Sequence, residues 1–407
     1  MSSFIRRFVV TGAAVVLSAG TLAACGGDDN SSSSDGSSGG TSSTEGISAA
    51  CSLDNPPQSA AEPPKESADV GTASGKVGVI LPDTTSSTRY TLYDAPLLTK
   101  SLSEAGLTPD VQNAQGDKNK FASIAQNMIG NGVKVLLIDS IDAASGAGVE
   151  KAADEAGVQV IDYDRVNLGG TAPYYVTFDS EDVGKLQAQT MIDCLTAQGV
   201  DNPNIIMMNG GTDVDNNAVL FAKGAHEVLD PLVDEGKATI TQEATVKGWL
   251  VENAAPTFQQ ALTAAGGQVD GVLAANDGIA NAIIGVLKTS GLNGHVVITG
   301  QDASVEGLQN IITGEQSMTV FKDVTLEAAA ASQLAIVLAQ GKDPAAAGMT
   351  LVPFDDPQAP DHNLQAVLLP TNVITQANVQ DVIDSGALKA SEVCKGIESD
   401  CQELGIS

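Results

Sequence analysis

The chain has 407 residues, of which 43% are hydrophobic, and its formal net charge is −30. This length exceeds what one hydrophobic core usually organises, so we expect two lobes. The acidic balance argues against a nucleic-acid-binding protein, because phosphate contacts need a concentrated basic surface and the sequence has none. We interpret the charge as a source of solubility rather than as an interaction site.

The first residues form a targeting segment. Two arginines precede a mostly apolar run that ends in Leu22-Ala23-Ala24-Cys25-Gly26. Small residues before a cysteine resemble a bacterial lipoprotein processing box, in which residues 1–24 are removed and Cys25 takes the lipid. The alternatives are an ordinary signal peptide or a membrane anchor, but the run is short for a membrane span. We therefore expect an extracytoplasmic protein that is anchored to the cell membrane through Cys25.

Residues 25–75 are rich in Ser, Gly, Asp and Pro, which predicts a flexible tether between the lipid and the folded body. Four further cysteines follow Cys25, and an even number outside the membrane indicates possible disulfides. Cys394 and Cys401 are close enough in sequence to close a small loop, which leaves Cys51 with Cys194. No Cys-x-x-Cys pair or His cluster occurs, so we expect neither a metal nor a cofactor.

From Lys76 onward, short apolar runs alternate with amphipathic segments of helical length, a pattern typical of the α/β class. The first set has strands at 77–81, 108–112, 134–138, 158–162 and 174–178, and helices at 92–105, 119–131 and 143–156. The second set has strands at 204–208, 239–244, 271–275 and 296–300, and helices at 180–196, 216–229, 253–265 and 278–290. The end holds a short helix after Asp302, strands at 318–321 and 364–369, and helices at 325–340 and 376–385. Two such sets and a short return predict two doubly wound parallel-sheet lobes that exchange segments, with a ligand cleft between them.

Polar residues follow nearly every expected strand, at the sheet edge where ligands of open parallel sheets bind. They are Arg89, Tyr90, Asp164, Arg165, Asn216, Asn217, Lys247, Trp249, Asn276, Asp277, Gln301, Asp302 and Lys322. Each alone suits a capping or solvated residue, but their recurrence in both halves predicts recognition of a neutral polyhydroxylated molecule. Carboxylates and amides pair with vicinal hydroxyls, and arginine spans two oxygens. The indole of Trp249 would cover the C–H face of a sugar ring, although a core position is the alternative.

Seven stretches of the body carry a family resemblance: 158–165, 178–188, 211–218, 248–254, 275–277, 300–303 and 318–322. Through them, residues 76–390 resemble the type I periplasmic sugar-binding proteins, most closely the D-xylose-binding proteins of ABC importers. The resemblance implies that a monosaccharide is held by Arg89, Asp164, Arg165, Asn217, Asn276, Asp302 and Lys322, with Trp249 as a stacking aromatic. The family typically has a second tryptophan after the first of these residues, whereas Tyr90 stands there in this chain.

The resemblance also implies a mechanism. Two lobes joined by three crossover segments, here near 178–180, 302–305 and 341–351, close on the sugar and present the closed form to a membrane permease. The first lobe would comprise 76–178 and 304–343, the second 179–303 and 344–390, and residues 391–407 would form a tail. We expect a monomer that binds D-xylose or a related monosaccharide and has no catalytic residues.

Two other functions are compatible with parts of the sequence. A sugar-active enzyme would need two carboxylates facing one glycosidic bond, and Asp164 and Asp302 could meet across the cleft. Arg165 and Lys322 nearby favour hydroxyl binding instead, and none of the three histidines has a Ser-His-Asp or metal-ligand spacing. A sensor that presents its closed form to a receptor remains open.

Overall fold

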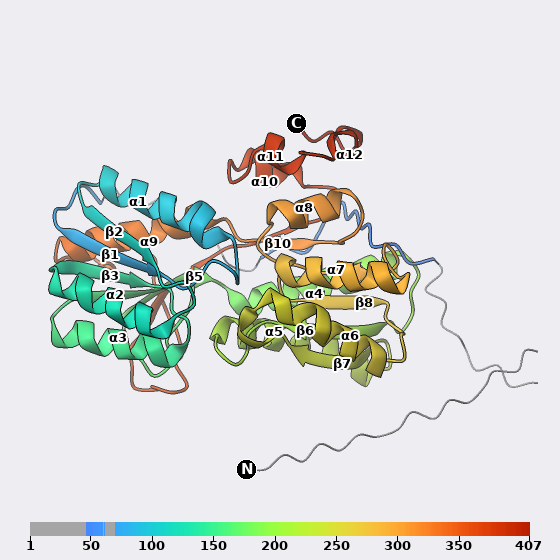
Figure 1. Cartoon of the computed structure of the whole chain (residues 1–407), viewed down its shortest axis with the longest axis horizontal. Coiled ribbons are helices and arrows are strands. Elements are labelled where there is room, and N and C mark those ends of the chain that lie inside the picture. Colours follow the sequence, from blue (N-terminus) through green and yellow to red (C-terminus); the bar gives the residue numbers. More distant parts are fainter. Residues whose placement is uncertain (1–45, 60, 62–69) are drawn as a thin grey trace, which may run out of the picture. The chain divides into compact units, whose positions relative to one another are not determined.

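The structure is a computed structural model that describes residues 46–59, 61 and 70–407 (Figure 1). The expected signal peptide at 1–24 and the expected lipid-bearing Cys25 lie outside the described residues. Within the described part of the chain, no helix is long and apolar enough to cross a membrane.

The first lobe contains a seven-stranded sheet in the order β11-β12-β5-β4-β3-β1-β2. Its strands are β1 (Lys76–Leu81), β2 (Thr108–Asn113), β3 (Val133–Ile138), β4 (Gln159–Tyr163), β5 (Tyr174–Phe178), β11 (Val352–Pro353) and β12 (Gln365–Leu369). All neighbouring pairs are parallel except β11 with β12.

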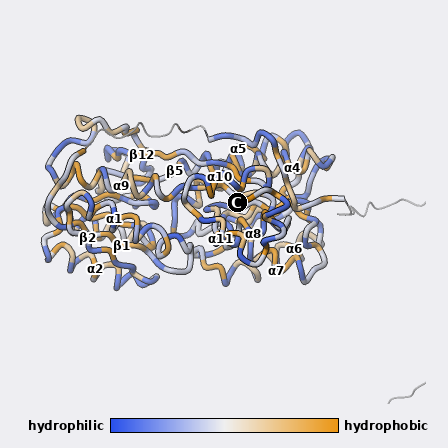
Figure 2. The backbone as a smooth tube through the Cα atoms, turned by 90° about the horizontal axis from the view of Figure 1, so that it is seen from above, coloured by the Kyte–Doolittle hydropathy of each residue, from blue (hydrophilic) through white to orange (hydrophobic). Residues whose placement is uncertain are grey.

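Helices cover both faces of this sheet (Figure 1). The helices are α1 (Ala95–Glu104), α2 (Lys118–Gly130), α3 (Ala143–Glu155) and α9 (Val324–Ala339). Val77 and Val79 of β1 pack in one core with α1 and α9, whereas Ile80 packs on the other face with α2 and α3. This alternation follows from the two-residue period of a strand. Figure 2 shows hydrophobic and hydrophilic residues interspersed along the backbone, as expected where most elements bury only one face.

The second lobe contains a four-stranded parallel sheet in the order β7-β6-β8-β9. Its strands are β6 (Asn204–Asn209), β7 (Thr239–Thr245), β8 (Gly271–Ala274) and β9 (Val297–Ile298), extended by β10 (Thr319–Phe321) and β13 (Asn372–Ile374). Its helices are α4 (Ser180–Ala197), α5 (Asn216–Asp234), α6 (Ala254–Ala264), α7 (Asp277–Ser290) and α8 (Val305–Ile312). The helices α4 and α5 approach closely because each has a glycine facing the other helix. A Cβ added to Gly184 of α4 would lie 2.0 Å from the Phe221 carbonyl oxygen of α5, and one added to Gly224 of α5 would lie 1.9 Å from the Glu181 carbonyl oxygen of α4.

The chain passes between the two sheets at 178–180, 321–324 and 369–372. The first crossing lies where it was expected, but the expected crossings at 302–305 and 341–351 are wrong. The residues after β9 stay in the second lobe because Gln301 bridges to Val320 of β10. The strand β12 belongs to the first lobe because it pairs in parallel with β5. The expected assignment of 304–343 to the first lobe and 344–390 to the second therefore changes: α8 and β10 belong to the second lobe, and β11 and β12 to the first.

Part of the expected tether packs on the folded body. We call residues 46–59 the N-terminal segment. Cys51 is disulfide-bonded to Cys194 of α4 and is buried in the core of the second lobe. Gln58 forms a β-bridge with Asn372, directly after the third crossing. Val70 contacts the other lobe, where its carbonyl oxygen accepts a hydrogen bond of 2.8 Å from the Gln340 side chain. Described residues of the expected tether thus contact both lobes.

The last residues also pack rather than form a free tail. The helices α10 (Gln380–Asp384), α11 (Ala390–Val393) and α12 (Glu398–Glu403) follow β13. Val393 and Cys401 share a small core with Leu308 of α8, and a disulfide joins Cys394 to Cys401.

Candidate functional site

The candidate site is a cavity of about 30 Å³ at the carboxyl ends of the strands of both sheets. All nine side chains that the sequence placed in a ligand site line it, so the fold brings together residues that are up to 233 positions apart, from Arg89 to Lys322. The cavity is also lined by Ser86, Ser87, Asp215, Phe221 and Gln301. Sequence reasoning missed these five as ligand residues. Only Gln301, next to Asp302 at a strand end, carried a signal.

Asp164 lies at the centre of the first-lobe wall, in the turn between β4 and β5. Its carboxylate accepts hydrogen bonds from Tyr90 Oη at 3.1 Å, Arg89 at 3.3 Å and Lys322 at 3.4 Å. Burial would raise the pKa of Asp164, but the positive charges of Lys322, Arg89 and Arg165 outweigh burial and lower it well below its usual range. Asp164 is therefore a charged hydrogen-bond acceptor at physiological pH.

Arg89 is held from behind by two buried acids. Its Nε and Nη2 atoms donate to both carboxylate oxygens of Asp94 at 2.9 and 2.7 Å, and Nη2 also donates to Glu327 of α9. Burial raises the pKa of Glu327 to about 8, despite the lowering effect of Arg89. Arg89 and Lys322 thus lie in one buried cluster with the carboxyl groups of Asp94, Asp164 and Glu327.

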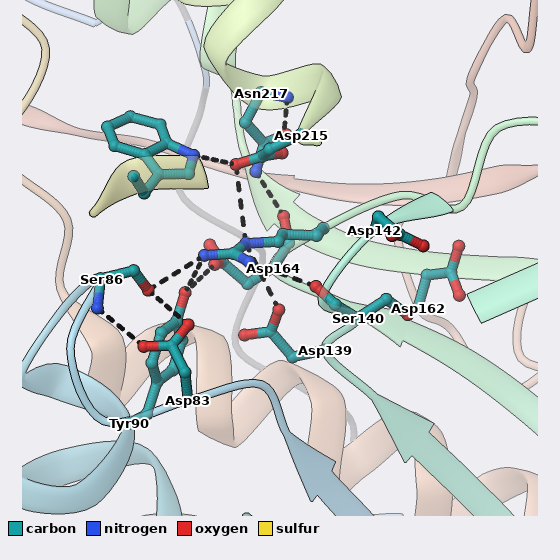
Figure 3. Close-up of polar contacts among 12 residues, drawn as sticks. Asp83, Ser86, Tyr90, Asp139, Ser140, Asp142, Asp162, Asp164, Asp215 and Asn217 are labelled. Atoms are coloured by element: carbon teal, nitrogen blue, oxygen red, sulfur yellow. Dashed lines mark hydrogen bonds and ion pairs between the residues drawn. The ribbon is translucent and has the colours of Figure 1, made fainter. Parts of the chain in front are cut away.

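Arg165 contacts several walls of the cavity. Its partners Ser86, Tyr90, Ser140 and Asp215 are drawn in Figure 3. Its Nη2 donates to Tyr90 Oη at 3.1 Å and to Ser86 Oγ at 3.3 Å, and Nη1 donates to the carbonyl oxygen of Ser140. Its Nε lies 3.6 Å from Asp139 and 3.5 Å from Asp215 of the second lobe. The guanidinium is therefore surrounded by acceptors on both sides of the cleft.

The second-lobe wall begins at the N-terminus of α5. Asp215 caps this helix by accepting a hydrogen bond from the Asn217 backbone N–H at 2.9 Å, and it accepts another from Trp249 Nε1 at 3.0 Å. The Asn217 side chain crosses to the first lobe and donates to the carbonyl oxygen of Asp164 at 2.7 Å. The indole needs Gly210 beneath it, because an added Cβ there would lie 2.1 Å from the ring. Trp249 is thus held in place by its hydrogen bond to Asp215 and by the space that Gly210 leaves for its ring.

The rest of this wall comes from the ends of β8 and β9. Asn276 caps α7 through a hydrogen bond of 2.9 Å from the Ile279 N–H, and its amide faces the carbonyl oxygen of Ser86 at 3.5 Å. Asp302 lies 3.4 Å from Ser87 Oγ across the cleft. Asp302, Asp164 and Trp249 have positive φ angles of 93°, 60° and 60°, which non-glycine residues rarely adopt. Such strained backbone clusters at functional sites.

The arrangement suits hydrogen bonding rather than covalent chemistry. No histidine or cysteine lines the cavity. The part of the chain that the structure describes contains no cluster of side chains with metal-ligand geometry. Three cations and several carboxyls instead surround a small space with three aromatic rings, Tyr90, Phe221 and Trp249.

Comparisons with known proteins agree with this geometry. Residues 77–343 match the family described as periplasmic binding protein domain. The D-xylose-binding periplasmic protein of Escherichia coli (strain K12) is 40% identical over 253 residues, which cover 62% of this chain and 75% of the relative. The multiple sugar-binding periplasmic receptor ChvE of Rhizobium radiobacter is 32% identical over 336 residues, covering 78% and 92%. A carbohydrate transporter solute binding protein from Chloroflexus aurantiacus, solved with D-glucose, superposes with a TM-score of 0.69 at 29% identity, covering 79% of this chain and 98% of that one.

Proposed function

Because this chain belongs to the periplasmic binding protein domain family, we propose that it is the lipid-anchored, extracytoplasmic substrate-binding protein of an ABC sugar importer. It binds a monosaccharide, with D-xylose as the first choice, in the cleft between its lobes and delivers it to a membrane permease. The observation that carries this proposal is the cavity lined by Asp164, Asp302 and Trp249 from both sheets.

The charges of the cavity favour a neutral ligand. Arg89 is paired with Asp94 and Asp164, and Lys322 lies 3.4 Å from Asp164. Arg165 has two carboxylates within 3.6 Å. An anionic ligand such as a phosphate or a uronate would need cations that are not already neutralised. Sugar hydroxyls, which both donate and accept, suit a lining of paired charges.

The size of the cavity supports a mechanism in which the lobes move. A volume of about 30 Å³ holds little more than a water molecule, so a monosaccharide requires the lobes to separate. Direct contacts between the lobes, such as the hydrogen bond from Asn217 to the Asp164 carbonyl, are then exchanged for contacts with the sugar. Rotation would occur at the crossings 178–180, 321–324 and 369–372, where Asp179 and Asp323 cap the helices that follow.

The proposal is tested by a thermal-shift screen of monosaccharides followed by calorimetric titration. A ligand that binds only the folded protein raises its melting temperature, so D-xylose or a related neutral aldose should do so and D-galacturonate should not. Asp164→Ala and Asp302→Ala should each weaken binding at least about 100-fold, because each removes a carboxylate that lines the cavity and would accept from a ligand hydroxyl. Asp201→Ala, at an exposed loop position, is the control. Wild-type affinity in both cleft variants, or a response to acidic sugars alone, would overturn the proposal.

A further inference from the structure

Tyr90 lies in the wall of the cavity, where its ring contacts two arginine side chains. It begins the π-helix η1 (Tyr90–Asp94), and its side chain is buried in the wall of the cavity. Its ring centroid lies 5.7 Å from the guanidinium carbon of Arg89 and 5.8 Å from that of Arg165. The ring thus contacts two guanidiniums, a favourable arrangement for both cations.

The Tyr90 hydroxyl joins the two charged residues at the end of β4 (Figure 3). It donates a hydrogen bond of 3.1 Å to Asp164 Oδ2 and accepts one of 3.1 Å from Arg165 Nη2. A phenolic hydroxyl has one proton to donate and can accept in return. The Tyr90 oxygen therefore makes the same two interactions with this acid–base pair that one hydroxyl of a bound sugar would make.

On the second-lobe wall, unlike at the Tyr90 hydroxyl, a buried acceptor lacks a hydrogen-bond partner within the described part of the protein. Gln301 lines the cavity and is buried, and its Oε1 atom has no hydrogen-bond partner among the described residues. A buried acceptor without a partner is costly, so this wall has capacity for a ligand hydroxyl. The Arg165 Nη2 atom, by contrast, already donates to both Tyr90 and Ser86. Tyr90 Oη and Arg165 Nη2 thus have partners within the protein, whereas Gln301 Oε1 is open to the ligand.

We propose that the Tyr90 hydroxyl determines specificity by taking the place of one ligand hydroxyl at Asp164 and Arg165. The cleft then favours a monosaccharide that presents C–H groups to this edge, and it discriminates against a sugar with an additional hydroxyl or hydroxymethyl group there. A pentopyranose such as D-xylose differs from its hexose counterpart D-glucose by one hydroxymethyl group. This inference rests on the proposed function and adds a reason for preferring the smaller sugar.

Tyr90→Phe is the direct test, because it removes one oxygen and keeps the ring. The readout is the ratio of dissociation constants within sugar pairs that differ at one position: D-xylose with D-glucose, and D-xylose with its epimers L-arabinose and D-lyxose. In at least one pair, the discrimination against the disfavoured sugar should fall by at least about 10-fold. A residue that only stabilises the wall would weaken both members of each pair by the same factor. Ratios unchanged within about twofold in every pair would overturn the inference.

Two further variants keep the test decisive. Tyr93→Phe removes the same oxygen three residues later, where the side chain packs against the small C-terminal core, and should leave every ratio unchanged. If Tyr90→Phe does not fold, as judged by circular dichroism, Tyr90→Trp retains a ring and one donor but cannot accept from Arg165, and it should shift the same ratio. Failure of the wild-type protein to bind any monosaccharide overturns the proposed function and this inference together. Binding with unchanged ratios overturns this inference alone.

Discussion

The buried Glu327 side chain predicts how the free energy of unfolding changes with pH. Its side chain on α9 is fully buried. One carboxyl oxygen accepts a hydrogen bond from Arg89, and the other has no hydrogen-bond partner within the described residues. Burial raises its pKa from an ordinary value of 4.5 to about 8. The folded protein therefore holds the Glu327 proton between about pH 4.5 and pH 8, where the unfolded chain has released it.

The perturbation is Glu327→Gln, which keeps the shape of the protonated side chain but has no proton to release. Because the unfolded chain binds fewer protons in this window, the free energy of unfolding of the wild-type protein falls as the pH rises, by about 1.4 kcal/mol per pH unit from this group. The variant lacks this contribution. Relative to the wild type, it should gain about 3 kcal/mol between pH 5.5 and pH 7.5, as an upper bound.

The assay is urea unfolding of both proteins at the two pH values, followed by far-ultraviolet circular dichroism. Tryptophan fluorescence is unsuitable, because the single tryptophan, Trp249, belongs to the other lobe. Other buried carboxyls are common to both proteins, so the difference isolates Glu327. Glu104→Gln, exposed at the end of α1, is the matched control and should follow the wild type. A difference that is independent of pH, or that favours the wild type as the pH rises, would refute the reasoning, since Glu327 would then be an ionised partner of Arg89.

Two further predictions concern the second lobe. Replacing Cys51 and Cys194 with serine opens a loop with a sequence separation of 143, compared with 7 for the C-terminal disulfide. Chain entropy then predicts that removing the Cys51–Cys194 disulfide lowers the free energy of unfolding by about 5 kcal/mol, and removing Cys394–Cys401 by about 2–3 kcal/mol. Urea unfolding measures both, and equal losses would contradict this account. Gly210→Ala should displace the indole of Trp249 and weaken sugar binding at least about 10-fold in calorimetric titration. Gly285→Ala, where an added Cβ meets open space, is its control and should bind normally.

Local patterns in the sequence predicted most of the strands and nine of the residues that line the cavity. The expected strand at 134–138 is observed at Val133–Ile138, because a short apolar run between turns is a strong strand signal. Asp164 and Asp302 could be placed at one cleft because both follow strands whose carboxyl ends share an edge. The strands β10 and β12 were identified as strands but assigned to the wrong lobes. Their partners, β13 and β5, are not neighbours in sequence, and no local pattern encodes such pairing.

The residues behind the cleft were not predictable for a different reason. Glu327 lies in a helix that is buried on nearly all sides, so no apolar stripe distinguishes its inner face. Asp139 follows β3 in the same way as many solvated residues follow strands, and its approach to Arg165 depends on the turn after β4. The N-terminal segment also bonds to the body through the bridge between Gln58 and Asn372 and the hydrogen bond from Ala49 N–H to the Gly294 carbonyl, which its tether-like composition does not indicate. Each of these features arises from tertiary contacts between distant residues.

The positions of β12 and β13 have a consequence for the order in which the molecule can be completed. β12 joins the first sheet beside β5, and β13 joins β10 of the second lobe, although the two strands are separated by only two residues. A chain made from its N-terminus cannot finish the first sheet before residue 369, or pair β10 with β13 before residue 374, has been synthesised. Until then, β5 and β10 each present an unpaired strand edge, which is a common starting point for aggregation. The final tenth of the chain therefore completes both lobes, and its loss would leave neither of them whole.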